Sequence, residues 1–266
     1  MAIDWHAALN AFLVMLILGS LVWLLSLPLK NASIVDSFWS VFFVAGAASY
    51  YLSIGQAGER SVLIAVLLLL WAVRLALHIT LRNRGQGEDR RYRAIRARNQ
   101  PHYEFKSLFY VFSLQAVLAW IIALPLFGAL SGQDPMSWLD ALGVLVWLTG
   151  FGFEAVGDWQ LTRFKADPAN AGKVMDRGLW RYTRHPNYFG ESLIWWGFWL
   201  IAASAGHAWA LVAPLLMTYM LLRISGVALL EKDLQVRRPA YADYIRRTNA
   251  FVPGPPRQAS FRGEAP

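Results

Sequence analysis

Residues 178–191 read G-L-W-R-Y-T-R-H-P-N-Y-F-G-E, and this polar run lies between two strongly apolar segments. Pro186 suits the first turn of a new helix, where its missing N–H would have no helical partner anyway. In that helix Asn187 and Glu191 share one face. A carboxylate inside an apolar segment costs roughly 2 kcal/mol or more unless it is paired, which favours a functional role for Glu191. The alternative is that the cationic residues of the run only mark the end of a membrane span.

The apolar blocks around this run define the class of protein. The chain has 266 residues, of which 56% are hydrophobic and 16% charged, whereas soluble domains are about 25% charged. Blocks of about 20 apolar residues are long enough to cross a bilayer. We therefore predict an all-α polytopic membrane protein, a single membrane-embedded domain over residues 1–266 with seven transmembrane helices. The expected spans are residues 7–27, 34–53, 61–81, 108–130, 138–162, 189–205 and 208–229.

The cationic residues predict the orientation in the membrane. Segments 82–106, 163–185 and 223–262 hold 22 of the 25 Lys and Arg residues, and cytoplasmic loops carry such an excess. Seven crossings then place the C-terminus in the cytoplasm and the N-terminus outside, in a multi-pass protein of a bacterial inner membrane. This orientation explains the formal charge of +8 without nucleic acid. Residues 255–266 resemble a disordered tail, and the absence of cysteine excludes disulfides and thiolate nucleophiles.

The fifth expected span ends in polar residues at helical spacing. Glu154 and Asp158 are four residues apart, so both carboxylates lie on one face of an apolar helix, with Lys165 beyond them. Two acids on one face repel each other unless cations or hydroxyls lie between them. A ribose diol or an amide would donate the hydrogen bonds that they need. The alternative is that the pair binds an arginine or lysine from a neighbouring loop.

The loop 82–106 combines two glycines that permit a tight turn, Gly85 and Gly87, with a dense polar cluster. Its functional interpretation is a lid whose arginines hold phosphates and whose Tyr92 stacks on a ring. The alternative is a positive-inside loop that contacts anionic lipid. The candidate binding residues of this loop are Arg82, Arg84, Glu88, Asp89, Arg91 and Tyr92.

Charged residues also enter the second and third expected spans. Asp36 lies one turn inside the second, with Trp39 a turn further on, while Arg74 and His78 are four residues apart in the third. The alternative role of Asp36 is a helix-start carboxylate stabilised by the helix dipole. An Arg–His stripe inside a membrane helix usually faces a cavity.

Polar residues continue after the seventh span, with Arg223, Tyr241 and Tyr244. The two tyrosines lie on a short amphipathic segment, which is either an interfacial helix or a flap over the cytoplasmic mouth. Acids, arginines and aromatics thus gather at the cytoplasmic ends of several spans. Such a gathering describes a site for a large anionic cofactor that opens into an apolar chamber.

Three motifs carry a family resemblance: the run at 178–191, the pattern E-x-x-x-D-x-x-x-x-x-x-K from Glu154, and the loop R-N-R-G-x-G-E-D-R-R-Y. Together they resemble the steroid 5α-reductase family, in particular its bacterial membrane proteins. The similarity extends from Asp36 to Pro253 and is strongest over residues 150–260. It implies a seven-helix bundle that binds NADPH from the cytoplasmic side. The implied reaction is hydride transfer to the double bond of an α,β-unsaturated ketone, typically a Δ4-3-ketosteroid or a related polycyclic or isoprenoid lipid.

The resemblance also implies roles by position. The family's catalytic pair is an acid in the second helix and a tyrosine in the third. Asp36 matches the first, whereas residues 61–81 contain no tyrosine, so Arg74 and His78 are the catalytic candidates there. Trp39 is the candidate substrate contact. No metal and no oligomer is implied. The NADPH-binding candidates, besides the loop residues above, are Glu154, Asp158, Lys165, Lys173, Tyr182, His185, Asn187, Glu191, Arg223, Tyr241 and Tyr244.

Two other functions stay open as alternatives. Isoprenylcysteine carboxyl methyltransferases share an R-H-P-x-Y-x-G run and use S-adenosylmethionine, but they typically have a Glu-Glu pair where this chain has Glu231 and Lys232. A non-catalytic sterol- or lipid-binding protein would explain the missing tyrosine. A transporter is disfavoured because the sequence shows no internal repeat.

Overall fold

The computed structural model of the chain describes residues 2–55, 58–224, 226–227, 231 and 240–257. Within these residues every named element is a helix, and five helices are long and apolar enough to cross a membrane. The chain divides into two compact units, which are described separately. Unit 1 comprises Met1–Gly143 and Phe198–Ala213, and unit 2 comprises Val144–Gly197 and Pro214–Pro266.

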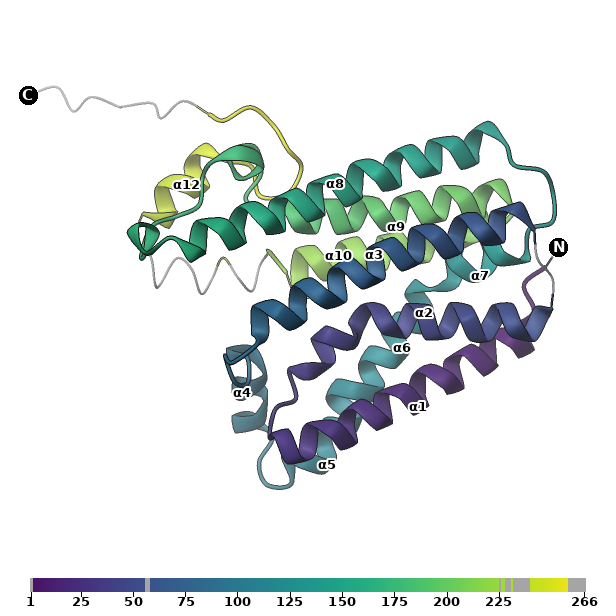
Figure 1. Cartoon of the computed structure of the whole chain (residues 1–266), viewed down its shortest axis with the longest axis horizontal. Coiled ribbons are helices and arrows are strands. Elements are labelled where there is room, and N and C mark those ends of the chain that lie inside the picture. The colour runs from purple at the N-terminus through teal and green to yellow at the C-terminus, as the bar shows by residue number, and fades with distance from the viewer. Residues whose placement is uncertain (1, 56–57, 225, 228–230, 232–239, 258–266) are drawn as a thin grey trace, which may run out of the picture. The chain divides into compact units, whose positions relative to one another are not determined.

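Unit 1 is built on three long helices, α1 (Trp5–Leu29), α2 (Ile34–Ile54) and α3 (Glu59–Asn83). α1 packs against α2, and α2 packs against α3 (Figure 1). The Asp4 carboxylate caps α1 by accepting hydrogen bonds from the first backbone N–H groups. Lys30 ends α1 in a left-handed conformation, with φ of 48°, and this residue reverses the chain into α2.

The polar loop after α3 contains its own helix, α4 (Arg90–Arg98). The chain enters this helix through Gly85 and Gly87, whose φ values of 75° and 68° lie in the left-handed region that glycine adopts without strain. The predicted tight turn is therefore confirmed. Asp89 follows the turn and accepts a hydrogen bond from the backbone N–H of Arg91, which starts α4.

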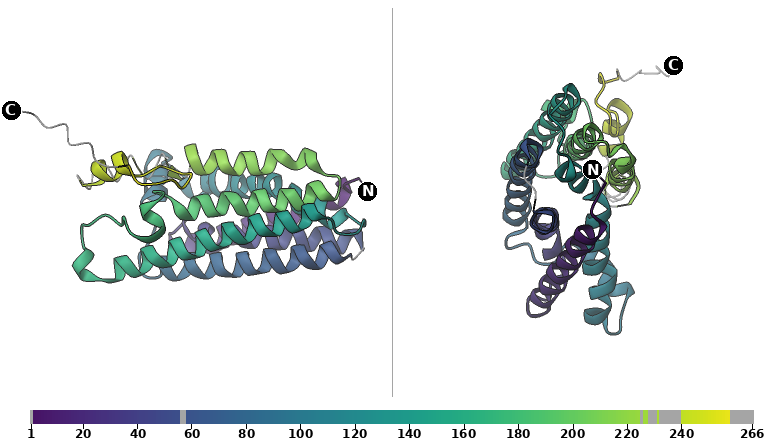
Figure 2. Two further views of the ribbon diagram at one scale, coloured as in Figure 1. Left: turned by 90° about the horizontal axis from the view of Figure 1, so that it is seen from above. Right: turned by 90° about the vertical axis from the view of Figure 1, so that its right-hand side faces the viewer.

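The next apolar segment of unit 1 is interrupted. α5 (Tyr103–Ser107), the π-helix η1 (Leu108–Ser113) and α6 (Leu114–Ile122) follow one another without a gap and form one candidate span. α7 (Leu124–Ser131) is separate because Pro125 lacks an N–H, and its ring would clash with a carbonyl of a continuous helix. α6 lies beside α1 and α2 (Figure 2).

A buried ion pair lies at the start of α3, far along the bundle from α4. Arg60 Nε and Nη2 donate to Asp140 Oδ1 and Oδ2 at 2.9 and 3.1 Å. The same guanidinium donates to the backbone carbonyls of Asp134 and Pro135 and lies 3.4 Å from Ser204 Oγ. The two charged side chains are 1% and 3% exposed. No sequence pattern predicted this pair.

Unit 2 combines long helices with short connecting turns. Its last described helix, α12, lies beside the turn that follows α8 (Figure 1). The elements that lie wholly or partly in this unit are α8 (Trp138–Ala166), η2 (Pro168–Asn170), η3 (Gly178–Arg181), α9 (Pro186–Ser204), α10 (Val212–Tyr219), η5 (Met220–Ile224) and α12 (Tyr241–Arg247).

Five of the seven expected spans coincide with helices that satisfy the length and composition of a membrane span. The fourth begins at Tyr103 rather than at residue 108, and it breaks at Pro125. α9 begins at Pro186, as predicted, while the last apolar helix, Ala208–Ile224, is shorter than a full span. The expected continuation to residue 229 and the predicted tail beyond residue 257 lie outside the described residues, apart from residues 226–227.

Candidate functional site

In unit 1, the first turn of α2 meets the first turn of α4. Tyr92 Oη donates a hydrogen bond of 2.6 Å to Asp36 Oδ1, and Arg91 Nη2 donates one of 2.8 Å to Asp36 Oδ2. Tyr92 is 7% exposed, whereas the side chains of Arg91 and Asp36 are 35% and 19% exposed. Asp36 thus accepts one neutral and one charge-assisted hydrogen bond, which is the arrangement of an ionised carboxylate.

The hydroxyl of Tyr92 is held from two sides. Gln115 Nε2 of α6 donates to Tyr92 Oη at 3.0 Å, while the hydroxyl proton lies toward Asp36. Burial raises the pKa of Tyr92 well above its ordinary value, and the neighbouring Asp36 carboxylate raises it further. The phenol therefore stays protonated at neutral and mildly alkaline pH. We predicted only a stacking role for the Tyr92 ring, and the pairing of its hydroxyl with Asp36 is new information.

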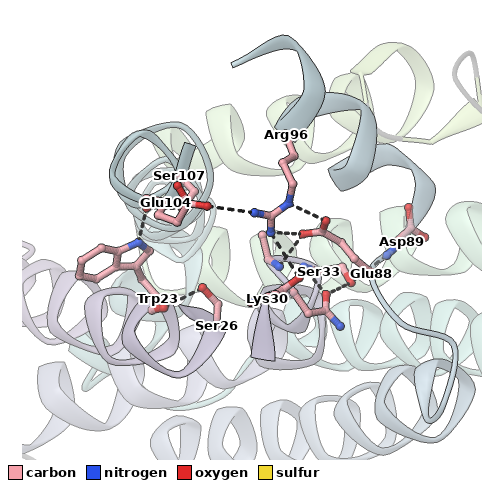
Figure 3. A network of polar contacts seen from close by, with 11 residues as sticks. Trp23, Ser26, Lys30, Ser33, Glu88, Asp89, Arg96, Glu104 and Ser107 are labelled. Atoms are coloured by element: carbon pink, nitrogen blue, oxygen red, sulfur yellow. Dashed lines mark hydrogen bonds and ion pairs between the residues drawn. The ribbon is translucent and has the colours of Figure 1, made fainter. Parts of the chain in front are cut away.

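Arg91 is oriented by a second carboxylate. Asp89 Oδ1 accepts from both the backbone N–H and the Nε of Arg91, at 2.8 and 3.1 Å. Burial alone would lower the pKa of Arg91, but the carboxylates of Asp36 and Asp89 outweigh it and raise that pKa. Asp89 N–H donates to Ser33 Oγ at 3.1 Å (Figure 3). The start of α4 is therefore tied to the turn between α1 and α2.

A second set of contacts, which we call the α4 clasp, joins Glu88 and Arg96 to the same turn (Figure 3). Glu88 accepts a hydrogen bond of 2.8 Å from the Ala32 N–H and two of 2.9 Å from the Arg96 guanidinium. That guanidinium also donates to the Lys30 carbonyl and lies 4.4 Å from the centroid of the Tyr103 ring. Burial raises the pKa of Glu88, but the hydrogen bonds from Arg96 and Ala32 outweigh it and lower that pKa overall.

The predicted third-helix candidates lie on α3, where Arg74 and His78 are partly buried. Trp39 of α2 packs edge-on against Phe43, which packs against Trp71. Trp39 is therefore part of an aromatic row between α2 and α3. The residues that hold Asp36 in unit 1 thus include two that the sequence assigned only to cofactor binding.

In unit 2, α8 and α9 approach each other closely at two glycines. A Cβ added to Gly150 or Gly190 would collide with the backbone of the opposite helix. This approach brings the polar residues of the two helices together, and Asn187 Nδ2 donates to Asp158 Oδ1 at 3.0 Å. The sequence assigned both residues to one site, and in the structure they are in direct contact.

The surroundings of this contact are rich in hydrogen-bond acceptors. Glu154 and Asp158 are 2% and 6% exposed, and Glu191 lies partly buried one turn after Asn187. Asn187 Oδ1 is buried and accepts no hydrogen bond from any residue that the structure describes. A buried acceptor without a donor is destabilising, so this atom favours a ligand that brings an N–H or O–H group.

The run at 178–191 forms an ion-pair cluster of its own. Arg184 Nε and Nη2 donate to the two oxygens of Glu231 at 2.7 and 3.0 Å, and His185 Nε2 lies 3.1 Å from Glu231 Oε1. Arg184 and His185 are 7% and 3% exposed. Burial raises the pKa of Glu231, but the hydrogen bonds from His185 and Arg184 outweigh it and lower that pKa to about 2. The charge of Arg184 is therefore matched inside the protein.

α12 packs against this cluster. Arg184 Nη1 donates to the backbone carbonyl of Thr248, and Tyr244 Oη donates to the carbonyl of Trp180. Tyr241 and Tyr244 are 4% and 2% exposed, and burial raises the pKa of both hydroxyls. The predicted interfacial segment or flap is a helix docked on the turn before α9 (Figure 1).

The remaining binding candidates differ from these buried groups, because all of them are exposed. They border the ends of helices and the loop between η2 and η3, where a soluble ligand can reach them without displacing core contacts. These residues are Arg82, Arg84, Lys165, Lys173, Tyr182 and Arg223. Our sequence reasoning missed Gln115 as a partner of Tyr92 and Arg184 as a partner of Glu231. A lone carboxylate shortly after an apolar span was the one available signal for Glu231.

Comparison with known proteins identifies a family whose matched residues include the Asp36–Tyr92 contacts of unit 1 and the Asn187–Asp158 contact of unit 2. Residues 22–248 match a family described as a protein of unknown function, DUF1295. The chain belongs to the DUF1295 family. This is a family of steroid 5α-reductase-like proteins. An uncharacterized protein of Schizosaccharomyces pombe is 29% identical to this DUF1295 chain, in an alignment that covers 94% of the chain and 82% of the relative. No solved structure matches the chain.

Proposed function

We propose that this DUF1295 protein uses NADPH to reduce the carbon–carbon double bond of an α,β-unsaturated ketone, a Δ4-3-ketosteroid or a related polycyclic or isoprenoid lipid. The observation that carries the proposal is the set Asp36, Arg91 and Tyr92, in which an ionised acid orients a buried phenol. The resemblance to steroid 5α-reductases calls for an acid and a tyrosine. α4 offers the tyrosine that α3 lacks.

The reaction needs a donor at the ketone oxygen. When bound, NADPH supplies the hydride that adds to the β-carbon and leaves as NADP⁺, and a proton then adds to the α-carbon. Between these events the ketone oxygen carries the negative charge of an enolate, and a preorganised hydrogen-bond donor at such an oxygen is usually the largest catalytic contribution. Tyr92 fits this role because its raised pKa keeps its hydroxyl proton in place.

The Tyr92 hydroxyl donates its proton to a hydrogen bond with Asp36, so the ketone oxygen must replace Asp36 as the acceptor of that bond. Arg91 lowers the free-energy cost of moving the Tyr92 hydroxyl from Asp36 to the ketone oxygen, because the charge-assisted bond from Arg91 to Asp36 Oδ2 remains when Tyr92 turns away. Gln115 continues to donate to the phenol oxygen and limits its movement. Asp36 is thus an acceptor that positions Tyr92. Arg74 and His78 remain the catalytic candidates of α3, and of these two His78 can deliver the proton that adds to the α-carbon.

Unit 2 supports the cofactor part of the proposal. The Asn187 Oδ1 atom without a donor among the described residues, on a side chain that also binds Asp158, suits the hydroxyls of a ribose or the N–H groups of a carboxamide. The exposed cations of this unit, Lys165, Lys173 and Arg223, suit phosphates, and cations beside the additional 2′-phosphate of NADPH would favour it over NADH. We further propose seven spans, with the N-terminus outside and the cofactor residues on the cytoplasmic side of a bacterial inner membrane.

The first test is turnover by the purified full-length protein in nanodiscs, with NADPH and a panel of enones that includes a Δ4-3-ketosteroid. Tyr92→Phe keeps the ring and removes the donor, so kcat should fall by about 10²–10³-fold. Tyr110→Phe, at a position that is 62% exposed, is the matched control and should keep the wild-type rate. Full activity of Tyr92→Phe would exclude Tyr92 as the donor, and no reduced product from any enone would overturn the reductase proposal.

A second test separates the cofactor from the alternatives. NADPH, NADH and S-adenosylmethionine are each added at a large excess, where a ligand at a hundredfold its Kd stabilises a protein by ~2.7 kcal/mol. NADPH should raise the unfolding temperature of the wild type and not of Asn187→Ala, which lacks the buried acceptor. A shift with S-adenosylmethionine alone would instead identify a methyltransferase, and no shift with any of them would favour a lipid-binding protein.

A further inference from the structure

A pocket of about 520 Å³ lies in unit 2 outside all the candidate residues discussed so far. Its wall combines the turn before and within η3, the end of α12 and the segment that follows α12. The lining residues are Asp176, Arg177, Gly178, Arg181, Arg247, Thr248, Pro256 and Arg257. Four arginines and one aspartate therefore line a space large enough for a small ligand.

The frame of this pocket is fixed by contacts that do not use its charges. Tyr244 Oη donates to the Trp180 carbonyl, and Gly254 N–H donates to the Tyr182 carbonyl at 3.0 Å. Arg257 N–H donates to the Arg247 carbonyl at 2.8 Å, which turns the chain back over the end of α12. Three separate stretches of the chain thus hold the four arginines at one place, independently of any ligand.

The arginines are poorly matched by protein acceptors. Arg247 approaches Asp176 only to 3.4 Å, and Arg257 approaches Asn249 Oδ1 only to 3.4 Å. The guanidinium groups of Arg177 and Arg181 make no hydrogen bond or ion pair with any residue that the structure describes. Like charges gathered in one pocket repel each other, and an anion with several oxygens would relieve this repulsion.

We propose that this pocket binds a phosphate group through Arg177, Arg181, Arg247 and Arg257. Planar guanidinium groups bind phosphate oxygens in a bidentate manner. A carboxylate ligand has only two oxygens to share among four arginines, whereas a phosphate group has more. The contrast with Arg184 supports the assignment, because Arg184 lies nearby in the same run but is matched by Glu231. The phosphate comes either from a soluble phosphate compound or from the headgroup of an anionic phospholipid. The inference does not depend on the proposed reductase activity.

The test uses the full-length protein in nanodiscs of phosphatidylcholine, titrated with inorganic pyrophosphate, and in nanodiscs that also contain phosphatidylglycerol. The readout is the unfolding temperature of the wild type and of two double variants. Arg177→Gln with Arg181→Gln removes the two unmatched arginines of the pocket. Arg163→Gln with Arg246→Gln is the matched control, since both residues are exposed arginines of unit 2 outside the pocket and the change in charge is the same.

Two results support the site and distinguish its ligand. If the source is soluble, pyrophosphate stabilises the wild type and the control, and its apparent Kd rises by about a hundredfold in the pocket variant, about tenfold for each lost charged partner. If the source is lipid, phosphatidylglycerol raises the unfolding temperature of the wild type and control but not of the pocket variant, and pyrophosphate adds nothing further. Equal responses of the two double variants, or no response of the wild type to either probe, would overturn the inference.

Discussion

Two ion pairs of unit 1 differ in how deeply they are buried and in how many of their polar atoms bind other groups of the protein. Arg60 and Asp140 form a bidentate pair whose side chains are 1% and 3% exposed, and further guanidinium N–H groups bind backbone carbonyls. Arg91 and Asp36 share a single bond, with side chains 35% and 19% exposed, and Asp36 also accepts the Tyr92 phenol. The first pair is closed to ligands, whereas the second keeps polar atoms that a ligand can reach.

The difference shows how burial separates a pair that is closed to ligands from one that is open to them. Removing one member of a closed pair leaves an unmatched charge in the interior, so such a pair is sensitive to mutation without taking part in chemistry. A mutation in an open pair lowers the free energy of unfolding of the protein by less than a mutation in a closed pair. Its value lies in orienting a third group, here the hydroxyl of Tyr92. The following predictions test this contrast, from the largest expected effect to the smallest.

Breaking the closed pair should give the largest loss of stability. Asp140→Ala leaves the Arg60 guanidinium buried without its carboxylate, which should lower the free energy of unfolding by about 3–5 kcal/mol. Chemical denaturation of the purified protein measures this loss. Asp134→Ala is the control, because Arg60 uses only the backbone carbonyl of Asp134 and the side chain is exposed. Similar stabilities of the two variants would contradict the structural role of the pair.

The closed pair of unit 2, Arg184 with Glu231, adds a pH dependence. The pKa of Glu231 is lowered from 4.5 to about 2, so the folded state favours the ionised form. Its contribution, about 3 kcal/mol, is fully present above about pH 4.5 and is lost as the pH falls toward 2. The unfolding temperature of the wild type should therefore fall across this acidic range. Glu231→Gln should be less stable at neutral pH and should show a flatter profile, and parallel profiles for the two proteins would exclude Glu231 as the cause.

The open pair should reveal itself in kinetics rather than in stability. Asp36→Asn and Tyr92→Phe should each lower kcat for the enone, but their combined effect should be smaller than the sum of the two, since Asp36 acts through Tyr92. The expected coupling in the double-mutant cycle is about 1–2 kcal/mol of activation free energy. Denaturation midpoints of all three variants serve as the control for folding. Fully additive effects on kcat would mean that the two residues act independently.

The apolar pattern of the sequence predicted the helices well, because burial and span length depend on local composition. The turn at Gly85 and Gly87 and the start of α9 at Pro186 were also predictable, since both depend on the backbone preferences of single residues. Asn187 and Asp158 were assigned to one site because each stood out on an apolar helix, and the structure joins them by a hydrogen bond.

Contacts between distant segments were not predictable in this way. Tyr92 and Asp36 are 56 residues apart, and Arg184 and Glu231 are 47 apart, so no helical periodicity relates them. The sequence indicated that each charged residue in an apolar segment needs a residue of opposite charge nearby, but it offered several such residues for each. Arg60 illustrates the limit, because its position in a chain with only 25 cationic residues resembles that of any loop arginine. Only the packing of α3 against the chain around Asp140 distinguishes it.

The smallest expected effect concerns the α4 clasp, which holds the open pair in place. Glu88→Gln removes the charge that binds Arg96 but keeps an oxygen for the Ala32 N–H, so the free energy of unfolding should fall by only about 1 kcal/mol. Arg91 and Tyr92 would then be less well oriented, so the activation free energy calculated from kcat should rise by more than this loss of stability. Glu104→Gln is the control, since its carboxylate is 56% exposed and lies 3.6 Å from the same arginine. If Glu88→Gln kept the wild-type kcat, the position of Tyr92 would not depend on the clasp, and the open pair alone would have to orient the phenol.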